Sequence, residues 1–348
     1  MKRLAIALAL ALALAVAPTV ASAATNDPLF GQQWSLGQIN AEPAWATSTG
    51  AGATIAILDT GVDLDHPDLA GKIAGGATFI GCAETGPCGN GDWESGGEVG
   101  TGHPHGTHVA GSAAAITGNG EGIAGVAPDS SLLAVKVLGA DGGTFDEIAA
   151  GIRWATDNGA DVINMSLGAL PGAQALAITG ALDATRDAVA YAVANGVTVV
   201  AAAGNDFASI CGEPAFDPNI LCVVSTDRNE LRSAFSNFAI DGSITNAVAA
   251  PGGAAFLSCA DDVISTVPVG SEGACGAGTP GYDAYAGTSM ATPHVAGVAA
   301  LLHAQGRSNL AVVDALKATA RNPVTGLRGV WDPVYGHGIV DAAAAVAD

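Results

Sequence analysis

Residues 53–61 read ATIAILDTG, a run of apolar side chains that ends in Asp59 and a Thr-Gly turn. An apolar run bounded by turn residues is typical of a strand that is buried on both faces, as in a parallel sheet. Further runs of this kind follow along the chain, at 131–139, 160–168, 196–205, 220–225 and 246–252. The sequence therefore predicts a sheet built mostly of buried parallel strands.

Helical patterns alternate with these strands, at 105–116, 144–158, 181–195, 289–304 and 309–320. The third ends in Asn195-Gly196, a common left-handed helix stop. Alternation of this kind predicts an α/β fold of three layers, a mostly parallel central sheet with helices on both faces. No linker divides 24–348, so we expect one domain there. Reactive groups of such sheets collect beyond the carboxyl ends of the strands, where Asp59 and Asn205 lie.

The first 23 residues have the features of a secretory signal peptide. Lys2 and Arg3 form its basic start, 4–17 its apolar stretch, and Ala-Ser-Ala at 21–23 its cleavage site. No later apolar run reaches the roughly 20 residues of a membrane-spanning helix. The sequence predicts a secreted, extracellular protein without a membrane anchor.

The net charge is −21, and removal of Lys2 and Arg3 leaves 33 acidic against 10 basic side chains. A surface this acidic repels nucleic acid and anionic lipid, and it favours cation binding. We therefore expect neither a nucleic acid partner nor a membrane partner.

Six cysteines follow the signal, as is usual in an oxidising compartment. Six cysteines allow 15 pairings, so the sequence does not decide their connectivity. We favour three local pairs, because each would close one loop rich in Gly or Pro: Cys82–Cys88, Cys211–Cys222 and Cys259–Cys275.

GTSMATPHVAG at 287–297 places Ser289 at the start of a helix. Pro293 fits a first turn, because it lacks the N–H that would bond the carbonyl of Ser289. A helix-capping role explains Ser289 taken alone. Elsewhere the chain supplies Asp59 at a strand end, and His105 in HPHGTHVAG (103–111) at the start of another helix.

Together these residues have the chemistry of nucleophilic catalysis. A serine is a weak nucleophile until a base takes its proton, and that base needs a carboxylate to hold its tautomer and steady its charged form. Asn205 can donate an amide hydrogen bond to an oxyanion, assisted by the Ser289 N–H at the helix start. Each residue has a structural alternative, but their joint occurrence favours catalysis.

At these positions the chain resembles the subtilases, the subtilisin-like serine peptidases. The motifs DTGVDLDHPDL (59–69), HGTHVAG (105–111), SLG (166–168), AAAGN (201–205) and GTSMATPHVAGVAALL (287–302) occur in the order typical of that family. The opening from Asn26 is similar to the mature start of thermitase-like members, so the resemblance covers 26–346. It implies a serine endopeptidase with Asp59, His105 and Ser289 as the triad and Asn205 as oxyanion donor. It also implies a monomer acting on protein or peptide substrates.

The resemblance further implies where the substrate lies. An extended peptide would pair along Ser166, Leu167 and Gly168, as an added strand. The pocket for the P1 side chain, whose carbonyl is attacked, would have Ala203, Gly204 and Asn205 as its wall and Gly212 as its floor. A glycine floor leaves room for large apolar side chains. Glu213 keeps an alternative open, since a carboxylate at the rim would tolerate basic P1 residues.

A structural calcium ion is also implied. Asp27 and Asp68 match carboxylates that bind calcium in thermitase-like members. The loop ITGNGEGI (116–123) would add the amide of Asn119 and the carbonyls of Ile116, Glu121 and Ile123. Calcium prefers such oxygen ligands. The alternative is an unattached terminal residue and an ordinary turn.

Other assignments have weaker support. Asp63, Asp65 and Asp68 are expected to be too exposed to orient His105, and His108 to be packed in the interior. A lipase or esterase would need Gly-x-Ser-x-Gly and the order Ser…Asp…His, neither of which fits. A binding protein without activity is a further alternative, which the intact catalytic residues oppose. Only Ala24 and Thr25 separate the signal from the mature-like start, so no prodomain is expected.

Overall fold

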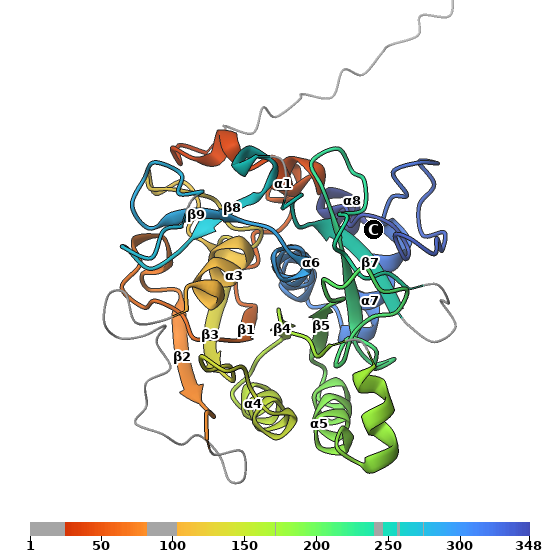
Figure 1. Ribbon diagram of the computed structural model, residues 1–348. Helices are drawn as coiled ribbons and strands as arrows, with labels where there is room; N and C mark the ends of the chain where they lie inside the picture. Colours follow the sequence, from red (N-terminus) through yellow and green to blue (C-terminus); the bar gives the residue numbers. More distant parts are fainter. Residues whose placement is uncertain (1–24, 82–102, 171, 240–245, 256–257, 274) are drawn as a thin grey trace, which may run out of the picture.

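The structure is a computed structural model that describes residues 25–81, 103–170, 172–239, 246–255, 258–273 and 275–348. Its centre is a seven-stranded parallel sheet with the order β2-β3-β1-β4-β5-β6-β7 (Figure 1). The strands are β1 (Thr54–Asp59), β2 (Ile73–Thr78), β3 (Ser131–Lys136), β4 (Val162–Met165), β5 (Thr198–Ala202), β6 (Leu221–Thr226) and β7 (Asn246–Pro251). All six predicted strands are present; five are shorter than predicted, and β6 has the predicted length but is shifted by one residue.

The edge strand β2 was not predicted. Its sequence, IAGGAT, contains Gly75 and Gly76, and glycine is depleted in strands because it supplies no side chain to pack. Its register with β3 shifts between Ile73 and Gly75. Such a segment has no apolar run from which a strand can be recognised.

Helices cover both faces of the sheet, which confirms the predicted fold class. Figure 1 shows α3 (His105–Ala114) and α6 (Thr288–His303) on one face, and α4 (Phe145–Asp157) and α5 (Asp183–Ala194) on the other. The other helices are α1 (Trp34–Gln38), α2 (Ala41–Ala44), α7 (Asn309–Thr319) and α8 (Ala342–Ala347). None of the helices in the described residues is both long and apolar enough to cross a bilayer.

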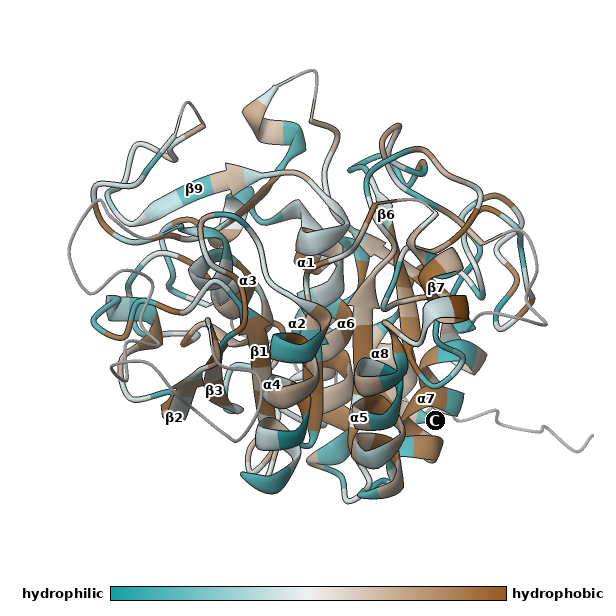
Figure 2. Ribbon diagram, turned by 60° about the horizontal axis from the view of Figure 1, so that its bottom comes forward, coloured by the Kyte–Doolittle hydropathy of each residue, from teal (hydrophilic) through white to brown (hydrophobic). Residues whose placement is uncertain are grey.

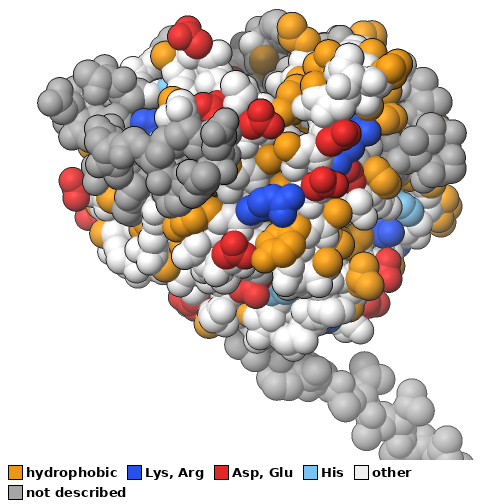
Figure 3. Space-filling model, turned by 90° about the horizontal axis from the view of Figure 1, so that it is seen from below, with side chains coloured by type: hydrophobic (Ala, Val, Ile, Leu, Met, Phe, Trp, Pro, Cys, Tyr) orange, Lys and Arg blue, Asp and Glu red, His pale blue; other side chains and the backbone are white. Residues whose placement is uncertain are grey.

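Hydropathy follows this layering. The strands in the middle of the molecule are hydrophobic, and hydrophilic positions face outward on α4 and α5 (Figure 2). Seen from below, the surface formed by these two helices carries acidic and basic side chains next to hydrophobic ones (Figure 3). Arg153 of α4 illustrates this mixture, because its guanidinium lies 5.5 Å from the ring centre of Tyr191 on α5.

The helix α6 is the central helix of the molecule. It packs against β4, β5, β6 and β7, and nearly every side chain along it is buried. A helix that is apolar on all sides needs such an environment. Gly297 permits α6 to lie close to Val126, since a Cβ at position 297 would lie 2.5 Å from the Cβ of Val126. The start of α6 is thereby fixed relative to the strand ends.

A small antiparallel pair, β8 (Val263–Thr266) and β9 (Tyr282–Tyr285), lies outside the main sheet. It packs with Leu29 and Ile123 into a second, smaller hydrophobic cluster. The N–H of Leu29 donates to the carbonyl of Gly122 at 2.7 Å, which ties the N-terminal segment to the loop after α3. These contacts bring the parts of the expected calcium site together.

Two of the expected disulfides are present, Cys211–Cys222 and Cys259–Cys275. They close loops with sequence separations of 11 and 16 residues. The third expected pair, Cys82–Cys88, lies outside the described residues.

Candidate active site

Three neighbouring strands end at the site. β4 pairs with β1 on one side and with β5 on the other, all in parallel. Asp59 is the last residue of β1, Ser166 follows β4, and Asn205 lies three residues beyond β5. Since the carboxyl ends of parallel strands share one edge of the sheet, these residues are brought to one place.

Asp59 and His105 form a direct pair. The Nδ1 atom of His105, the first residue of α3, lies 2.8 Å from Oδ1 of Asp59. The side chain of Asp59 is 0% exposed, and its Oδ1 also accepts from the N–H of Thr60 at 2.7 Å. Burial of a carboxylate is costly without such partners. The pairing leaves Nε2 of His105 as the ring nitrogen for proton transfer.

The charge of Asp59 controls the basicity of this histidine. Burial acts to lower the pKa of His105, but the charge of Asp59 and its hydrogen bond outweigh burial, so the pKa is raised above the ordinary 6.5. His108, three residues further along α3, behaves in the opposite way. It is buried and stacked on Tyr285, and burial lowers its pKa to about 3. His108 is therefore a neutral packing residue.

Ser289 is the second residue of α6 and is half-buried. Its Oγ donates to the carbonyl of Ser166 at 3.2 Å, and within the described residues no hydrogen bond joins it to His105. Its backbone N–H makes no hydrogen bond in the described part of the chain, as expected in the first turn of a helix. Hydrogen bonds of catalytic groups are often long or poorly aligned before substrate binds.

Asn205 is held by Thr288, the residue before Ser289. Its Oδ1 accepts from both the N–H and the hydroxyl of Thr288, at 2.9 Å and 3.0 Å. Because the amide oxygen is occupied, Nδ2 is the group that remains to donate. Thr288 was not among the predicted site residues, although its place beside Ser289 in the GTSMA motif was a usable signal.

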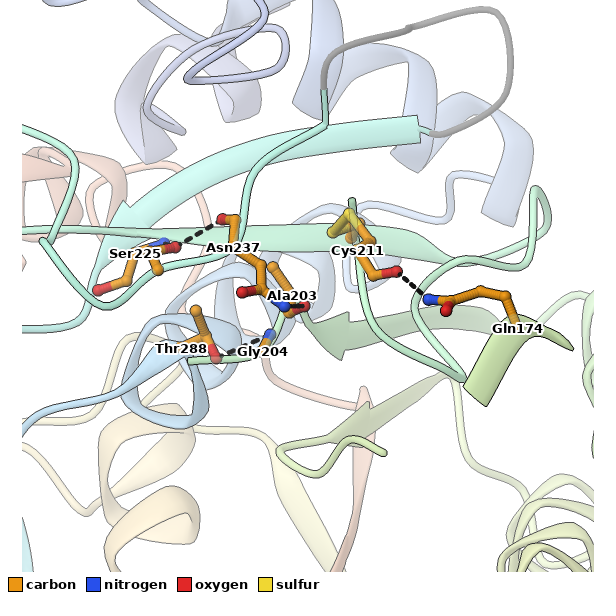
Figure 4. Close-up of a disulfide and its surroundings, with 9 residues drawn as sticks. Gln174, Ala203, Gly204, Cys211, Ser225, Asn237 and Thr288 are labelled. Carbon is orange, nitrogen blue, oxygen red and sulfur yellow. Dashed lines mark hydrogen bonds between the residues drawn. A yellow bond between two sulfur atoms is a disulfide. The ribbon is translucent and has the colours of Figure 1, made fainter. Parts of the chain in front are cut away.

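Asn237 holds the loop that carries Asn205. Its Nδ2 donates to the carbonyl of Ala203 at 3.0 Å (Figure 4). Its Oδ1 accepts from the N–H groups of Asp206 and Ala208, each at 2.9 Å. Gly204 is needed here, since its φ is +105° and a Cβ would lie 2.4 Å from Nδ2 of Asn237. Asn237 was not predicted either, because nothing in its local sequence links it to 203–208.

A cavity of about 470 Å³ opens beside His105. The segment 166–169 lines it, including the expected substrate-binding residues Ser166, Leu167 and Gly168. Gly212, the expected floor, lies between this segment and the expected wall: its N–H donates to the carbonyl of Ala203 at 2.8 Å, and a Cβ on it would lie 3.1 Å from the carbonyl oxygen of Ala169. The structure therefore brings the expected substrate-binding segments together.

The carboxylate of Glu213 does not stand free at the rim. It is 2% exposed, and its Oε1 lies 2.9 Å from a guanidinium nitrogen of Arg186 on α5. Burial raises the pKa of Glu213, and the bond and charge of Arg186 oppose that rise. Figure 4 labels Gln174, which also braces this segment by donating to the carbonyl of Cys211 at 2.9 Å.

The expected calcium ligands gather around the loop 116–123. Gly118 N–H donates to both carboxylate oxygens of Asp27 at 2.9 Å. Asp68 accepts from the amide of Asn119 at 2.8 Å and from the N–H of Ile123 at 2.9 Å. The expectation that Asp68 is exposed was wrong: it is fully buried, because β9 covers it and the hydroxyl of Tyr282 bonds it.

The donor set fits a hard cation. Asp27 and Asp68 are buried acids that form no ion pair with a basic side chain among the described residues. Three carbonyls of the loop accept no hydrogen bond in the described chain, those of Ile116, Glu121 and Ile123. Asn119 Oδ1 accepts one bond, from Glu121 N–H, which leaves a second lone pair. No group of three or more His, Cys, Asp or Glu side chains able to hold a metal occurs in the described residues. A cation at this place would therefore need the three loop carbonyls as ligands in addition to the two carboxylates.

Comparison with known proteins gives one consistent result. The profile of the subtilase family matches residues 50–338. Thermitase of Thermoactinomyces vulgaris is 43% identical over 308 residues, which cover 88% of this chain and 94% of thermitase. An extracellular protease of Xanthomonas campestris pv. campestris is 38% identical over 94% of this chain and 57% of its own length. A solved protease structure from Pseudoalteromonas arctica aligns with a TM-score of 0.75 at 35% identity, covering 93% of this chain and 99% of that one.

Proposed function

Because this chain belongs to the subtilase family and is therefore a serine endopeptidase, we propose that it is secreted and cleaves after large apolar residues. Ser289 is the nucleophile, His105 the general base and acid, and Asp59 the residue that orients His105. Asn205 and the Ser289 N–H stabilise the oxyanion. The substrates are proteins or peptides, and the enzyme acts as a monomer.

The proposed reaction begins with proton transfer. Ser289 Oγ turns from the Ser166 carbonyl toward His105 Nε2, gives it the proton, and attacks the scissile carbonyl carbon. The C–N bond then breaks as His105 returns the proton to the leaving amine, and an ester on Ser289 remains. A water molecule that gives its proton to His105 hydrolyses this ester and restores the Ser289 hydroxyl.

The oxyanion formed in each half-reaction accepts hydrogen bonds from two donors that have no other partner among the described residues. Thr288 occupies the amide oxygen of Asn205, which leaves Nδ2 available to donate. Ser289 N–H stands at the positive end of the α6 dipole. Because both are fixed before substrate arrives, they need no reorganisation in the transition state.

The observation that carries the proposal is the 2.8 Å bond between His105 Nδ1 and the buried carboxylate of Asp59. It fixes the histidine tautomer with a basic Nε2, which a serine nucleophile requires. A merely structural histidine would have no need of a buried, charged partner.

The preference for large apolar P1 residues rests on the cleft walls. Ala203 and Gly212 carry little side-chain bulk beside the segment 166–169, and the carboxylate that adjoins the floor, Glu213, is paired with Arg186. A paired carboxylate offers a basic P1 side chain no free charge.

Secretion rests on the signal-like residues 1–23, which lie outside the described residues, and on the similarity to an extracellular protease of Xanthomonas. The two disulfides are in keeping with export, since oxidising compartments favour them.

A calcium ion would be held by Asp27 and Asp68 together with Asn119 and the carbonyls of Ile116, Glu121 and Ile123. When bound it would neutralise two buried carboxylates and tie the N-terminal segment to the loop after α3. Its role is structural, because this site is separate from the residues proposed to react.

A single labelling experiment tests the proposal. The wild-type enzyme should react covalently with a fluorophosphonate and hydrolyse casein, whereas folded Ser289→Ala should do neither. Labelling that persists in Ser289→Ala would refute the assignment of the nucleophile. Hydrolysis of a short-chain acyl ester without hydrolysis of casein would indicate an esterase instead.

A further inference from the structure

The carbonyl of Ser289 needs a donor from outside its helix. In a regular α-helix the N–H of residue 293 would bond it, but Pro293 has no N–H. The nucleophile is therefore held less firmly by its own helix than the residues that follow it. A second contact is required to fix its backbone.

Ser166 supplies that contact. Its Oγ donates to the carbonyl of Ser289 at 2.8 Å, and the residue is 2% exposed. The bond joins the end of β4 to the first turn of α6, two elements that are far apart in sequence. It is independent of the Ser289 hydroxyl, so it persists when that hydroxyl turns toward His105.

Asn164 sets the direction of the Ser166 hydroxyl. Its Nδ2 donates to Ser166 Oγ at 3.0 Å, so that the hydroxyl accepts from Asn164 and its own proton is directed to Ser289. Asn164 is 0% exposed, and its Oδ1 has no hydrogen-bond partner in the described structure. An apolar residue in β4 would avoid the cost of this unpaired oxygen, so the donor at Nδ2 is what the asparagine contributes.

We propose that Ser166 and Asn164 are positioning residues for the nucleophile, acting through the carbonyl of Ser289. This inference rests on the proposed role of Ser289. A shift of the Ser289 backbone displaces both its Oγ and its N–H, the attacking atom and one oxyanion donor. The two hydrogen bonds from Asn164 to Ser166 and from Ser166 to Ser289 therefore hold these atoms in place for the transition state. They involve side chains of β4 and its end, so they do not use the backbone groups of 166–168 that would bind substrate.

The test is a double-mutant cycle between Ser166→Ala and Pro293→Ala. Ser166→Ala should lower kcat on a chromogenic peptide roughly ten- to a hundredfold, with KM changed less than about twofold, as expected for misplacement of a reacting group. Pro293→Ala supplies a backbone N–H to the Ser289 carbonyl. In that background Ser166→Ala should cost less than about threefold in kcat.

Two further variants serve as matched controls. Ser166→Thr keeps the hydroxyl and should retain most of the wild-type kcat, whereas Asn164→Leu, similar in size but without a donor, should resemble Ser166→Ala. Thermal melting shows which variants are folded. The rate of fluorophosphonate labelling should follow kcat, because it reports on Ser289 without a peptide substrate.

Some outcomes would overturn the proposal. If Ser166→Ala lowers kcat equally in the wild-type and the Pro293→Ala backgrounds, Ser166 does not act through the Ser289 carbonyl. A change in KM alone would assign Ser166 to substrate binding. Failure of the proposed function itself looks different, because wild-type labelling would then be absent or would survive in Ser289→Ala.

Discussion

The amide oxygen of Asn205 accepts two hydrogen bonds from Thr288, one from its N–H at 2.9 Å and one from its hydroxyl at 3.0 Å. Thr288 precedes Ser289, so the residue proposed to stabilise the oxyanion is oriented by the neighbour of the proposed nucleophile. The hydroxyl of Thr288 also accepts from the N–H of Gly204 at 3.2 Å. Attacking group and oxyanion donor are thus fixed to each other by one side chain.

Removal of the oxyanion donor should reduce turnover selectively. Asn205→Ala is expected to lower kcat about 10²–10³-fold, the magnitude known from subtilisin, with little change in KM. Thr288→Val, which removes the hydroxyl but keeps the shape, should cause a smaller loss because the N–H bond to Asn205 remains. Steady-state kinetics on one peptide substrate measure both. A change confined to KM would assign Asn205 to ground-state binding.

The pH dependence should reflect the pair of Asp59 and His105. His105 must be neutral to accept a proton, and its pKa is raised above 6.5, so activity should increase with pH through an acid limb that lies above 6.5. Asp59→Asn removes the charge that raises this pKa. The residual kcat/KM, about 10⁴-fold lower, should therefore have its acid limb at lower pH. An unchanged limb would mean that another group controls the profile.

Removal of calcium should destabilise the enzyme through Asp68. An ion bound only to the native state adds about 2.7 kcal/mol at a hundredfold excess over Kd. Melting with calcium and with a chelator should show a large drop in wild type and a much smaller one in Asp68→Ala. Asp65→Ala, an exposed carboxylate nearby, is the control and should behave as wild type. Equal drops in Asp68→Ala and wild type would locate the ion elsewhere.

Cleavage sites should follow large apolar P1 residues. A proteomic digest by wild type and by Glu213→Gln should give the same pattern, because the charge of Glu213 is already paired with Arg186. Cuts that fall mainly after Lys or Arg in wild type, and that decrease in Glu213→Gln, would show instead that this carboxylate attracts the substrate.

Peptide mapping without reduction should recover three local disulfides. Cys211–Cys222 and Cys259–Cys275 are present in the structure, and Cys82–Cys88 remains a prediction. Each should add on the order of 2–4 kcal/mol by restricting the unfolded chain. Reduction should lower the melting temperature without abolishing fluorophosphonate labelling at low temperature. A long-range pair involving Cys82 would contradict the local arrangement.

The central sheet and its layers could be predicted from local sequence alone. Runs such as 55–58 within the first strand are apolar at successive positions because parallel strands are buried on both faces, and this pattern needs no knowledge of neighbours. The strands β2, β8 and β9 lack it, since β2 contains two adjacent glycines and polar residues such as Ser265 and Asp283 interrupt β8 and β9. The four residues proposed to take part in catalysis could also be selected from the sequence, because each stands in a local motif at a strand end or a helix start.

The surroundings of those residues became visible only in the folded molecule. Asn237 donates a hydrogen bond to the carbonyl of Ala203, and Ser166 donates one to the carbonyl of Ser289. Both bonds join segments that are distant in sequence. Asp68 was expected to be exposed, but β9 buries it, and the charge of Glu213 is paired because α5 brings Arg186 to it. A local sequence can specify which chemical group a residue offers and which backbone conformation it prefers. Burial and partners depend on how distant elements pack, so they appear only once the chain is folded.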